Sequence, residues 1–402
     1  MNILLISNKY PSPPRDGGSL ATFNMARGLS GAGNRVDILA MKTSKHFSTP
    51  EKNEAAVPGA NQVSAVYVDT SVRYTGLLRN FFFSSFPYNA ERFISDDFSA
   101  KLANLLNENQ YDIIQMEGLY LLPYIPVIRA NSSAILVYRA HNVEYLIWRS
   151  YYLRENNFLK KFYLGKLYKR ILNLEQSFLN SYDLIVPITR LDLDQLNSMG
   201  NDKPYYIAPF GMYSDELPEY RKPETDDISL QYIGALDWMP NIDGLNWFID
   251  KVWNQLKSYR RGLVFRVAGR NANKDYARYL VKNGIDFWGE VGNAGEYLSQ
   301  NGILIVPLFA GSGIRVKIIE AMFMGKPVIT TSFAVSGIPV EHGKHMLLAD
   351  NENAFAEAVV KLLDDPGYAY ELGKNAKLLA QRHFNNTDIT KGLSAFYKKY
   401  AL

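Results

Sequence analysis

Short apolar segments alternate with amphipathic segments along the first half of the chain. Buried strands are predicted, from length and β-rich composition, at residues 2–7, 35–40, 65–68, 112–116, 135–138, 184–188 and 206–208. Helical spacing lies between several of them, first at residues 19–29 and then over 146–182, a stretch that we expect to divide near residues 155–156. This alternation is typical of a doubly wound parallel sheet with helices on both faces.

The same alternation restarts after a polar segment. Residues 214–227 contain two prolines and many charged side chains, which is the composition of a linker. Beyond it we predict strands at 229–233, 263–268, 285–288, 303–308 and 328–331, and helices at 242–256, 273–282, 294–298, 314–324, 353–364, 370–383 and 388–400. Two similar α/β halves imply a cleft lined by the carboxyl ends of both sheets.

The segment 303–332 holds the clearest candidate site. A buried strand leads into the small-residue turn 310–313, and a helix follows. The start of a helix has free N–H groups and the positive end of its dipole, so it favours an anion. Arg315 and Lys317 stand near that start, where the dipole disfavours each cation by about 0.3–1 kcal/mol. They therefore indicate a bound anion, with Glu320 able to accept from ribose hydroxyls, although a surface Arg and an ordinary Lys317–Glu320 pair would leave the same pattern.

Composition narrows the class of protein. The chain has 402 residues, of which 47% are hydrophobic and 21% are charged, as in a globular protein of two domains. No apolar run approaches the roughly 20 residues of a membrane span, and the N-terminal segment resembles a strand and turn more than a signal peptide. The absence of cysteine excludes disulfides and thiolate metal sites. We expect a cytoplasmic protein, and the net charge of +4 is too small to indicate nucleic acid.

Several segments together resemble a known family. They are YIGALDWMPNIDGLNWF from Tyr232, VAGRNAN from Val267, WGEVGNAGEYL from Trp288, PLFAGSGIRVKIIEAMFMGKPVITT from Pro307, the pair Gly17-Gly18, HNVE from His141 and VPITRLDLDQL from Val186. In this order and spacing they resemble glycosyltransferase family 4, retaining enzymes that use nucleotide sugars and have the GT-B architecture. The resemblance implies two Rossmann-like domains facing a cleft, with an acceptor-side domain at residues 1–210, a donor-binding domain at 211–385 and a final helix at 386–402 that packs back on the first.

The resemblance also implies roles for residues of the C-terminal half. Glu320 matches the second glutamate of the family's Glu-x7-Glu motif, which holds the ribose. Arg315 and Lys317 match positions that meet the diphosphate. Further binding candidates are Gly313 and Ile314 at the helix start, Glu290 and Val291 where the chain wraps the base, Gly234, and Arg270 as a phosphate ligand.

Two positions depart from the family pattern. The first glutamate of the motif would fall at position 312, where this chain has Ser312, so it either uses Ser312 or the adjacent N–H groups, or accepts a different donor. The usual basic pair after Gly234 is replaced by the segment 235–238, ALDW. Phosphate binding would then depend more on Arg315 and Lys317.

In the N-terminal half His141 matches a histidine that reaches the transferred sugar, with Asn142 beside it. A lone histidine is also often a hydrogen-bonded loop residue. Gly17 and Gly18 match a glycine loop that lets the sugar and diphosphate come close. Asp16 and Glu117 are candidate acidic groups near the carboxyl ends of strands, and structural roles are open for both.

Aromatic and basic side chains gather in the segment 146–182. It carries seven Lys and Arg against two Glu, interleaved with aromatic residues. Such helices suit an anionic inner membrane surface and a lipid-linked acceptor. An aromatic stripe facing the core beneath a basic outer face gives the same pattern, and the sequence favours neither.

These observations predict a transfer of sugar from a nucleoside diphosphate sugar to a glycan, lipid-linked or small-molecule acceptor, in bacterial surface polysaccharide or glycoconjugate synthesis. Cations and a helix start can neutralise the leaving diphosphate without a metal, and Asp192 and Asp194 lie in a helical stretch, so we predict no metal and no cofactor besides the nucleotide sugar. Two alternatives stay open. An epimerase would interconvert sugars without an acceptor, and a pseudoenzyme would bind nucleotide without turnover.

Overall fold

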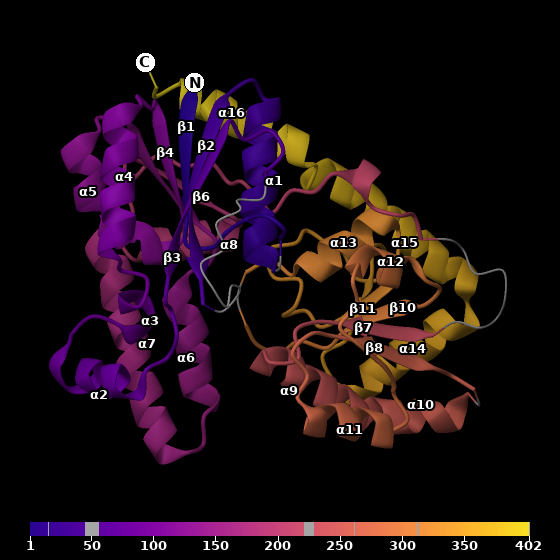
Figure 1. Cartoon of the computed structure of the whole chain (residues 1–402). Coiled ribbons are helices and arrows are strands. Elements are labelled where there is room, and N and C mark those ends of the chain that lie inside the picture. The colour runs from indigo at the N-terminus through magenta and orange to yellow at the C-terminus, as the bar shows by residue number, and fades with distance from the viewer. Residues whose placement is uncertain (15, 45–55, 221–228, 261, 312, 402) are drawn as a thin grey trace. The chain divides into compact units, whose positions relative to one another are not determined.

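The chain folds into two compact units. The computed structural model describes residues 1–14, 16–44, 56–220, 229–260, 262–311 and 313–401. The first unit comprises Met1–Gly211 and the segment from Asn386 onward, and the second comprises Met212–Asn385. Figure 1 labels the elements of both. Each unit is built around one parallel sheet.

The first unit contains a six-stranded parallel sheet. Its strands are β1 (Asn2–Ser7), β2 (Arg35–Thr43), β3 (Gln62–Val68), β4 (Ile113–Glu117), β5 (Ile135–Ala140) and β6 (Leu184–Pro187). They lie in the order β3-β2-β1-β4-β5-β6. Because β1, β4 and β5 are neighbours and parallel, the residues that follow their carboxyl ends meet at one edge of the sheet.

Helices cover both faces of this sheet. They are α1 (Gly17–Gly31), α2 (Tyr74–Phe83), α3 (Tyr88–Glu91), α4 (Asp96–Glu108), α5 (Ile125–Asn131), α6 (Glu144–Arg154), α7 (Phe158–Phe178), α8 (Arg190–Ser198) and α16 (Asn386–Lys398), with a 3-10 helix at Leu119–Tyr124. Alternate residues of β1 enter two separate cores. Ile3 and Leu5 pack with buried residues of α1 and α16, whereas Leu4 and Ile6 pack with those of α4, α5 and α7.

The last helix packs against the first. Asn386 Nδ2 donates to the Asn24 carbonyl at 2.7 Å, and Asn34 Nδ2 donates to Ser394 Oγ at 2.9 Å. A Cβ on Gly28 of α1 would lie 2.5 Å from Thr390 Cγ2. Only glycine therefore lets α1 and α16 approach this closely.

The second unit contains another six-stranded parallel sheet, in the order β12-β11-β10-β7-β8-β9. Its strands are β7 (Leu230–Ile233), β8 (Phe265–Ala268), β9 (Asp286–Gly289), β10 (Ile303–Val306), β11 (Val328–Thr330) and β12 (Leu347–Leu348). The helices are α9 (Met239–Phe248), α10 (Asn254–Tyr259), α11 (Lys274–Lys282), α12 (Ala294–Ser299), α13 (Val316–Met324), α14 (Glu352–Asp364) and α15 (Pro366–His383), with a 3-10 turn at Ser214–Glu216.

One predicted element is wrong. Residues 206–208 form no strand among the described residues, although Tyr206 N and Ala208 N donate to the sheet at 3.2 and 3.0 Å. Pro204 and Pro209 flank them and lack the N–H groups that would extend the ladder. The helix predicted at 242–256 is confirmed: this range is helical throughout, and it contains a π-helical turn at Ile249–Trp253 between α9 and α10.

The long stretch 146–182 divides as predicted, into α6 and α7. In the described residues no helix combines the length and the apolar character needed to cross a bilayer. The part of the predicted linker at 221–227 lies outside the described residues.

Candidate functional site

The candidate anion site of the second unit begins where β10 ends. All four residues of β10 are buried. The chain then turns through Gly311 and Gly313, whose φ angles of 113° and 74° favour glycine. Ser312 lies outside the described residues, so its predicted sugar contact is untested. Ile314 follows in the turn.

Helix α13 starts at Val316, two residues after the start that the sequence predicts at 314. Arg315 is the N-cap residue, with extended backbone angles (φ −85°, ψ 92°) and no side-chain capping bond, so it lies just before the first turn in which we predicted it. Its guanidinium donates to the Gly313 carbonyl and lies 5.3 Å from the centre of the Phe333 ring. The residue is 7% exposed. A nearly buried guanidinium therefore stands at the positive end of a helix.

Lys317 of α13 reaches the end of the neighbouring strand β7. Its Nζ donates to the Ile233 carbonyl at 2.7 Å and to Asn241 Oδ1 at 3.2 Å, and lies 4.6 Å from the centre of the Tyr232 ring. A Cβ on Gly234 would lie 2.9 Å from this Nζ, so glycine makes room for the ammonium group. The structure thus brings together Gly234 and Lys317, two predicted site residues that are far apart in the sequence.

The two ionisable side chains of α13 are both shifted towards neutrality. Burial, reinforced by the nearby Arg315 charge, lowers the pKa of Lys317 to about 7. Burial raises the pKa of Glu320 to about 7, against the opposing effect of Lys317. An anion bound beside Lys317 would favour its charged form, so the site can couple anion binding to proton uptake.

The remaining candidates of this unit follow adjacent strands. Arg270 lies just past β8, where its carbonyl accepts from Leu236 N at 2.9 Å. Glu290 and Val291 follow β9, and Glu290 is exposed. Since β10, β7, β8 and β9 are parallel neighbours, these residues share the sheet edge that carries the start of α13. Their contacts with a nucleotide stay predictions.

The first unit holds a buried polar network at the ends of β4 and β5. Glu117 Oε2 accepts from Arg139 Nη1 at 2.9 Å and lies 2.6 Å from His141 Nε2. The side chains of Glu117 and Arg139 are each 1% exposed, whereas that of His141 is 17% exposed. Thr22 Oγ1 donates to the same carboxylate oxygen at 3.3 Å. Glu117 therefore fixes the orientation of the His141 ring.

In this network Glu117 is ionised and His141 is neutral. Burial alone would raise the pKa of Glu117, but Arg139 and the hydrogen bond from His141 lower it to about 2. Burial lowers the pKa of His141, and the Glu117 carboxylate opposes this. The neutral imidazole then donates its Nε2–H to Glu117 and keeps Nδ1 as an acceptor.

Further polar side chains extend the network inward. Gln115 Nε2 donates to Glu117 Oε1, and the Tyr397 hydroxyl of α16 donates to Gln115 Oε1. The carboxylate of Glu117 is thus enclosed, and it accepts hydrogen bonds from the polar side chains around it. Its predicted direct contact with a substrate stays a prediction.

The glycine pair opens α1 after β1. Asp16 is the N-cap residue, because its Oδ1 accepts from Ser19 N at 2.9 Å. Its Oδ2 accepts from Lys9 Nζ at 2.8 Å. Gly17 is exposed, and a Cβ on Gly18 would stand 3.2 Å from Lys9 Nζ. In this structure Asp16 stabilises the helix start and pairs with Lys9, a cation that the sequence did not single out.

A glutamate from α7 holds the segment after His141. Helix α6 has no side-chain cap of its own at Val143. Instead Glu175 accepts from the backbone N–H groups of Glu144 and Tyr145 at 2.9 and 3.0 Å. Burial raises the pKa of Glu175 to about 8. Asn142 hydrogen-bonds the Glu144 side chain, so the whole turn after β5 is anchored.

These features define a class of protein. Two six-stranded parallel sheets with flanking helices form the GT-B architecture, as predicted. Residues 228–365 match the family model described as "Glycosyl transferases group 1". The predicted resemblance to GT-B glycosyltransferases is confirmed, while assignment to family 4 stays a prediction.

Particular relatives extend over nearly the whole chain. A Klebsiella pneumoniae protein described as "Uncharacterized 44.6 kDa protein in cps region" is 23% identical over 410 residues, covering 99% of this chain and 99% of its own length. Sucrose-phosphate synthase from Thermosynechococcus elongatus aligns with a TM-score of 0.74 at 17% identity, over 99% of this chain and 98% of its own. HepE from Anabaena, solved in complex with UDP, aligns with a TM-score of 0.68 at 15% identity, over 99% of this chain and 100% of its own. At these identities the solved structures show a common fold.

Proposed function

We propose that this chain transfers a sugar from a nucleoside diphosphate sugar to a glycan, lipid-linked or small-molecule acceptor, with retention and without a metal ion. The start of α13 is the observation that carries the proposal. Two cations, Arg315 and Lys317, converge there with Gly234 at the carboxyl edge of a parallel sheet. Their positive charge beside a helix start favours an anion, in a place where α/β proteins bind nucleotides.

The comparisons support a nucleotide-sugar donor. HepE is described in complexes with UDP, with UDP and glucose, and with UDP-glucose. The description of the Klebsiella relative places it in a cps region. We therefore assign this chain to surface polysaccharide or glycoconjugate synthesis in the cytoplasm.

The chemistry requires that the negative charge on the departing diphosphate be stabilised as the glycosidic phosphate bond breaks. Arg315, Lys317 and the N–H groups of the α13 start provide fixed positive charge for this purpose. Glu320 accepts from the ribose. In the first unit neutral His141, held by Glu117, offers Nδ1 to a sugar hydroxyl.

The first experiment asks whether the protein binds nucleotide sugars. A thermal-shift screen with UDP-, GDP-, ADP- and dTDP-sugars should reveal one that stabilises the protein by about 2.7 kcal/mol at 100 times its dissociation constant. Release of nucleoside diphosphate with an acceptor, unchanged by a chelator, would support metal-independent transfer. If no nucleotide raised the melting temperature, the donor-site assignment would be wrong. Binding without turnover would favour a pseudoenzyme, and sugar interconversion without acceptor would favour an epimerase.

A further inference from the structure

Three helices of the first unit carry exposed apolar side chains. In Figure 1, α6 and α7 lie side by side and α2 lies against α7. Phe158 is 80% exposed and Phe162 62%, while Phe83 on α2 is 87% exposed. The centre of the Phe81 ring lies 6.1 Å from that of Phe162 and 5.2 Å from that of Phe82. The Phe81 ring therefore links α2 to α7. We call this group the apolar patch; its members are Leu78, Phe82, Phe83, Leu153, Phe158, Leu159 and Phe162.

Cations of α7 fix α2 in this arrangement. Lys166 Nζ donates to the Phe81 carbonyl at 2.5 Å, and Arg170 Nη2 donates to the same oxygen at 3.0 Å. Arg170 Nη1 also donates to Asn80 Oδ1 at 3.0 Å. These bonds occupy a carbonyl in the last turn of α2, where helices lack internal donors and carry negative charge. The exposed rings of α2 are therefore presented on an anchored helix.

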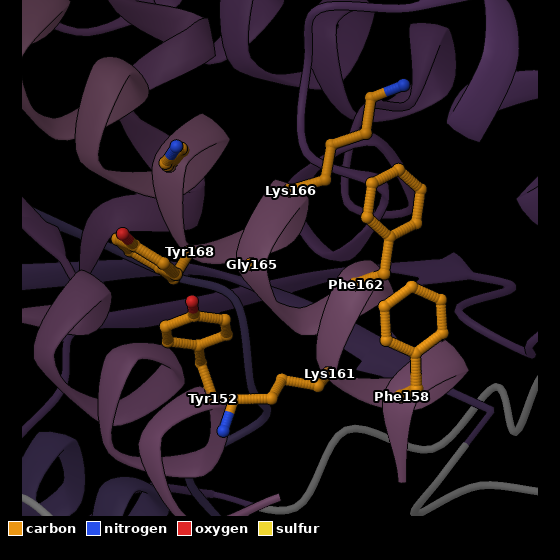
Figure 2. A pocket seen from close by; sticks show the side chains of 8 residues that line it. Tyr152, Phe158, Lys161, Phe162, Gly165, Lys166 and Tyr168 are labelled. Carbon is orange, nitrogen blue, oxygen red and sulfur yellow. The ribbon is translucent and has the colours of Figure 1, made fainter.

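A cavity of about 530 Å³ lies next to the apolar patch, between α6 and α7. Its lining residues are Tyr152, Phe158, Lys161, Phe162, Gly165, Lys166, Tyr168 and Lys169. Figure 2 shows the Tyr152 and Tyr168 rings together on one side, Lys161 running beside Tyr152, and Phe158 with Phe162 on the other side. A Cβ on Gly165 would stand 3.1 Å from the Tyr152 ring, so glycine permits this close packing. The cavity combines aromatic walls with ammonium groups.

The segment that contains the cavity's lining residues carries mostly positive charge. Residues 146–182 carry Arg149, Arg154, Lys160, Lys161, Lys166, Lys169 and Arg170. Of the two glutamates, Glu175 is buried and caps α6. Glu155 bonds the backbone of Asn157 at 2.8 Å. An occupant that matches this surface must be both apolar and anionic.

We propose that the face formed by α2, α6 and α7 docks on an anionic phospholipid bilayer, with the cavity holding the phosphate of one lipid headgroup. Phe158, Leu159 and the α2 rings enter the boundary between headgroups and acyl chains, as in helices that lie on a membrane surface. Lys160, Lys161 and Lys169 face the negative surface potential. Docking requires no turnover, so it stands or falls separately from the proposed transferase activity.

The test is flotation of the full chain with phosphatidylcholine vesicles and with vesicles of phosphatidylcholine and phosphatidylglycerol. We expect binding to the mixed vesicles and release as salt rises, since exposed charges are screened beyond about 8–10 Å near physiological ionic strength. Replacing Lys160, Lys161 and Lys169 by Gln should weaken binding by about fivefold per lysine. Lys166 is left in place because it holds α2.

A matched control removes the same charge elsewhere in the unit. Lys391, Lys398 and Lys399 on and just after α16 are exposed, and their replacement by Gln should leave vesicle binding unchanged. The apolar contribution is tested by Phe158→Gln with Leu159→Gln. Each side chain that leaves the bilayer should weaken binding by about tenfold or more.

Three results would overturn the proposal. The first is equal binding of the wild type to neutral and mixed vesicles. The second is an equal loss in the Lys160, Lys161, Lys169 variant and in its control. The third is a change in oligomeric state, measured by light scattering, in the Phe158 and Leu159 variant with no change in vesicle binding. That result would make the apolar patch an interface between copies of this chain.

Discussion

Removing the two cations at the start of α13 should abolish tight binding of a nucleoside diphosphate and leave binding of the nucleoside unchanged. We would replace Lys317 and Arg315 together by Gln. Glutamine removes the charge but keeps an N–H donor for the Ile233 carbonyl, which Lys317 bonds at 2.7 Å. Alanine would leave that carbonyl without its donor, at a cost of about 1–3 kcal/mol in folding free energy. The glutamine variant therefore separates binding from stability.

The expected loss of UDP affinity follows from the strength of charge-assisted hydrogen bonds. Each is worth about 1.5–3 kcal/mol, so two lost bonds give about 3–6 kcal/mol if they act independently. At about 1.4 kcal/mol per tenfold change, affinity for UDP should fall by roughly a hundredfold to ten-thousandfold. Neighbouring residues are rarely additive, so the lower limit is the firmer expectation. Uridine, which has no phosphate, should bind the variant and the wild type equally.

Isothermal titration calorimetry measures the affinities for UDP and for uridine. If the thermal-shift screen selects another nucleotide, that nucleotide and its nucleoside are used instead. The control replaces Lys274 and Arg278 of α11 by Gln; Lys274 is exposed, and the Arg278 side chain is 77% exposed. This variant loses the same charge from the same unit and should bind as the wild type does. The anion-site assignment would be refuted by wild-type UDP affinity in the Lys317 and Arg315 variant, or by an equal loss for uridine.

Two further predictions concern the first unit. His141→Ala should lower transfer at least about tenfold, or 1.4 kcal/mol, with unchanged nucleotide affinity, because the imidazole acts on the transferred sugar; wild-type turnover would make it a structural residue. Burial raises the pKa of Glu175 from its usual 4.5 to about 8, so ionising it costs stability as pH rises through that range. Melting temperatures should therefore fall less with pH in Glu175→Gln, which stays neutral and keeps an acceptor for α6, and parallel curves would contradict this.

The sequence predicts the central strands of both sheets well because these strands are buried on both faces. Such strands are continuous apolar runs, and β1 falls at residues 2–7 both in the pattern and in the structure. The π-helical turn has no such local signature. It ends at Trp253, which is buried and whose Nε1 donates to the Asn283 carbonyl at 3.2 Å. The 3.6-residue pattern continues through the turn, so the long-range contact that accompanies it is invisible in the sequence.

The site is predictable where its residues are local. Gly313, Arg315 and Lys317 lie together in one turn, and the physics of a helix start suffices to select them. The partners of His141 are not local. Glu117 lies 24 residues earlier, at the end of the neighbouring strand β4. Such contacts depend on the order of strands in the sheet, which hydrophobic periodicity does not give.

Buried charge is shifted differently in the two candidate sites, and the difference predicts how pH affects nucleotide binding and turnover. Arg139 and His141 hold the pKa of Glu117 at about 2, and burial keeps the pKa of His141 below its usual 6.5. Neither group changes charge between pH 7 and pH 8. Lys317 and Glu320, each with a pKa of about 7, both lose a proton in that range unless a bound anion holds the proton of Lys317. Raising pH should therefore weaken UDP binding by up to about tenfold per unit. Turnover at saturating donor should stay constant, and a parallel fall in both quantities would show that the sites titrate together.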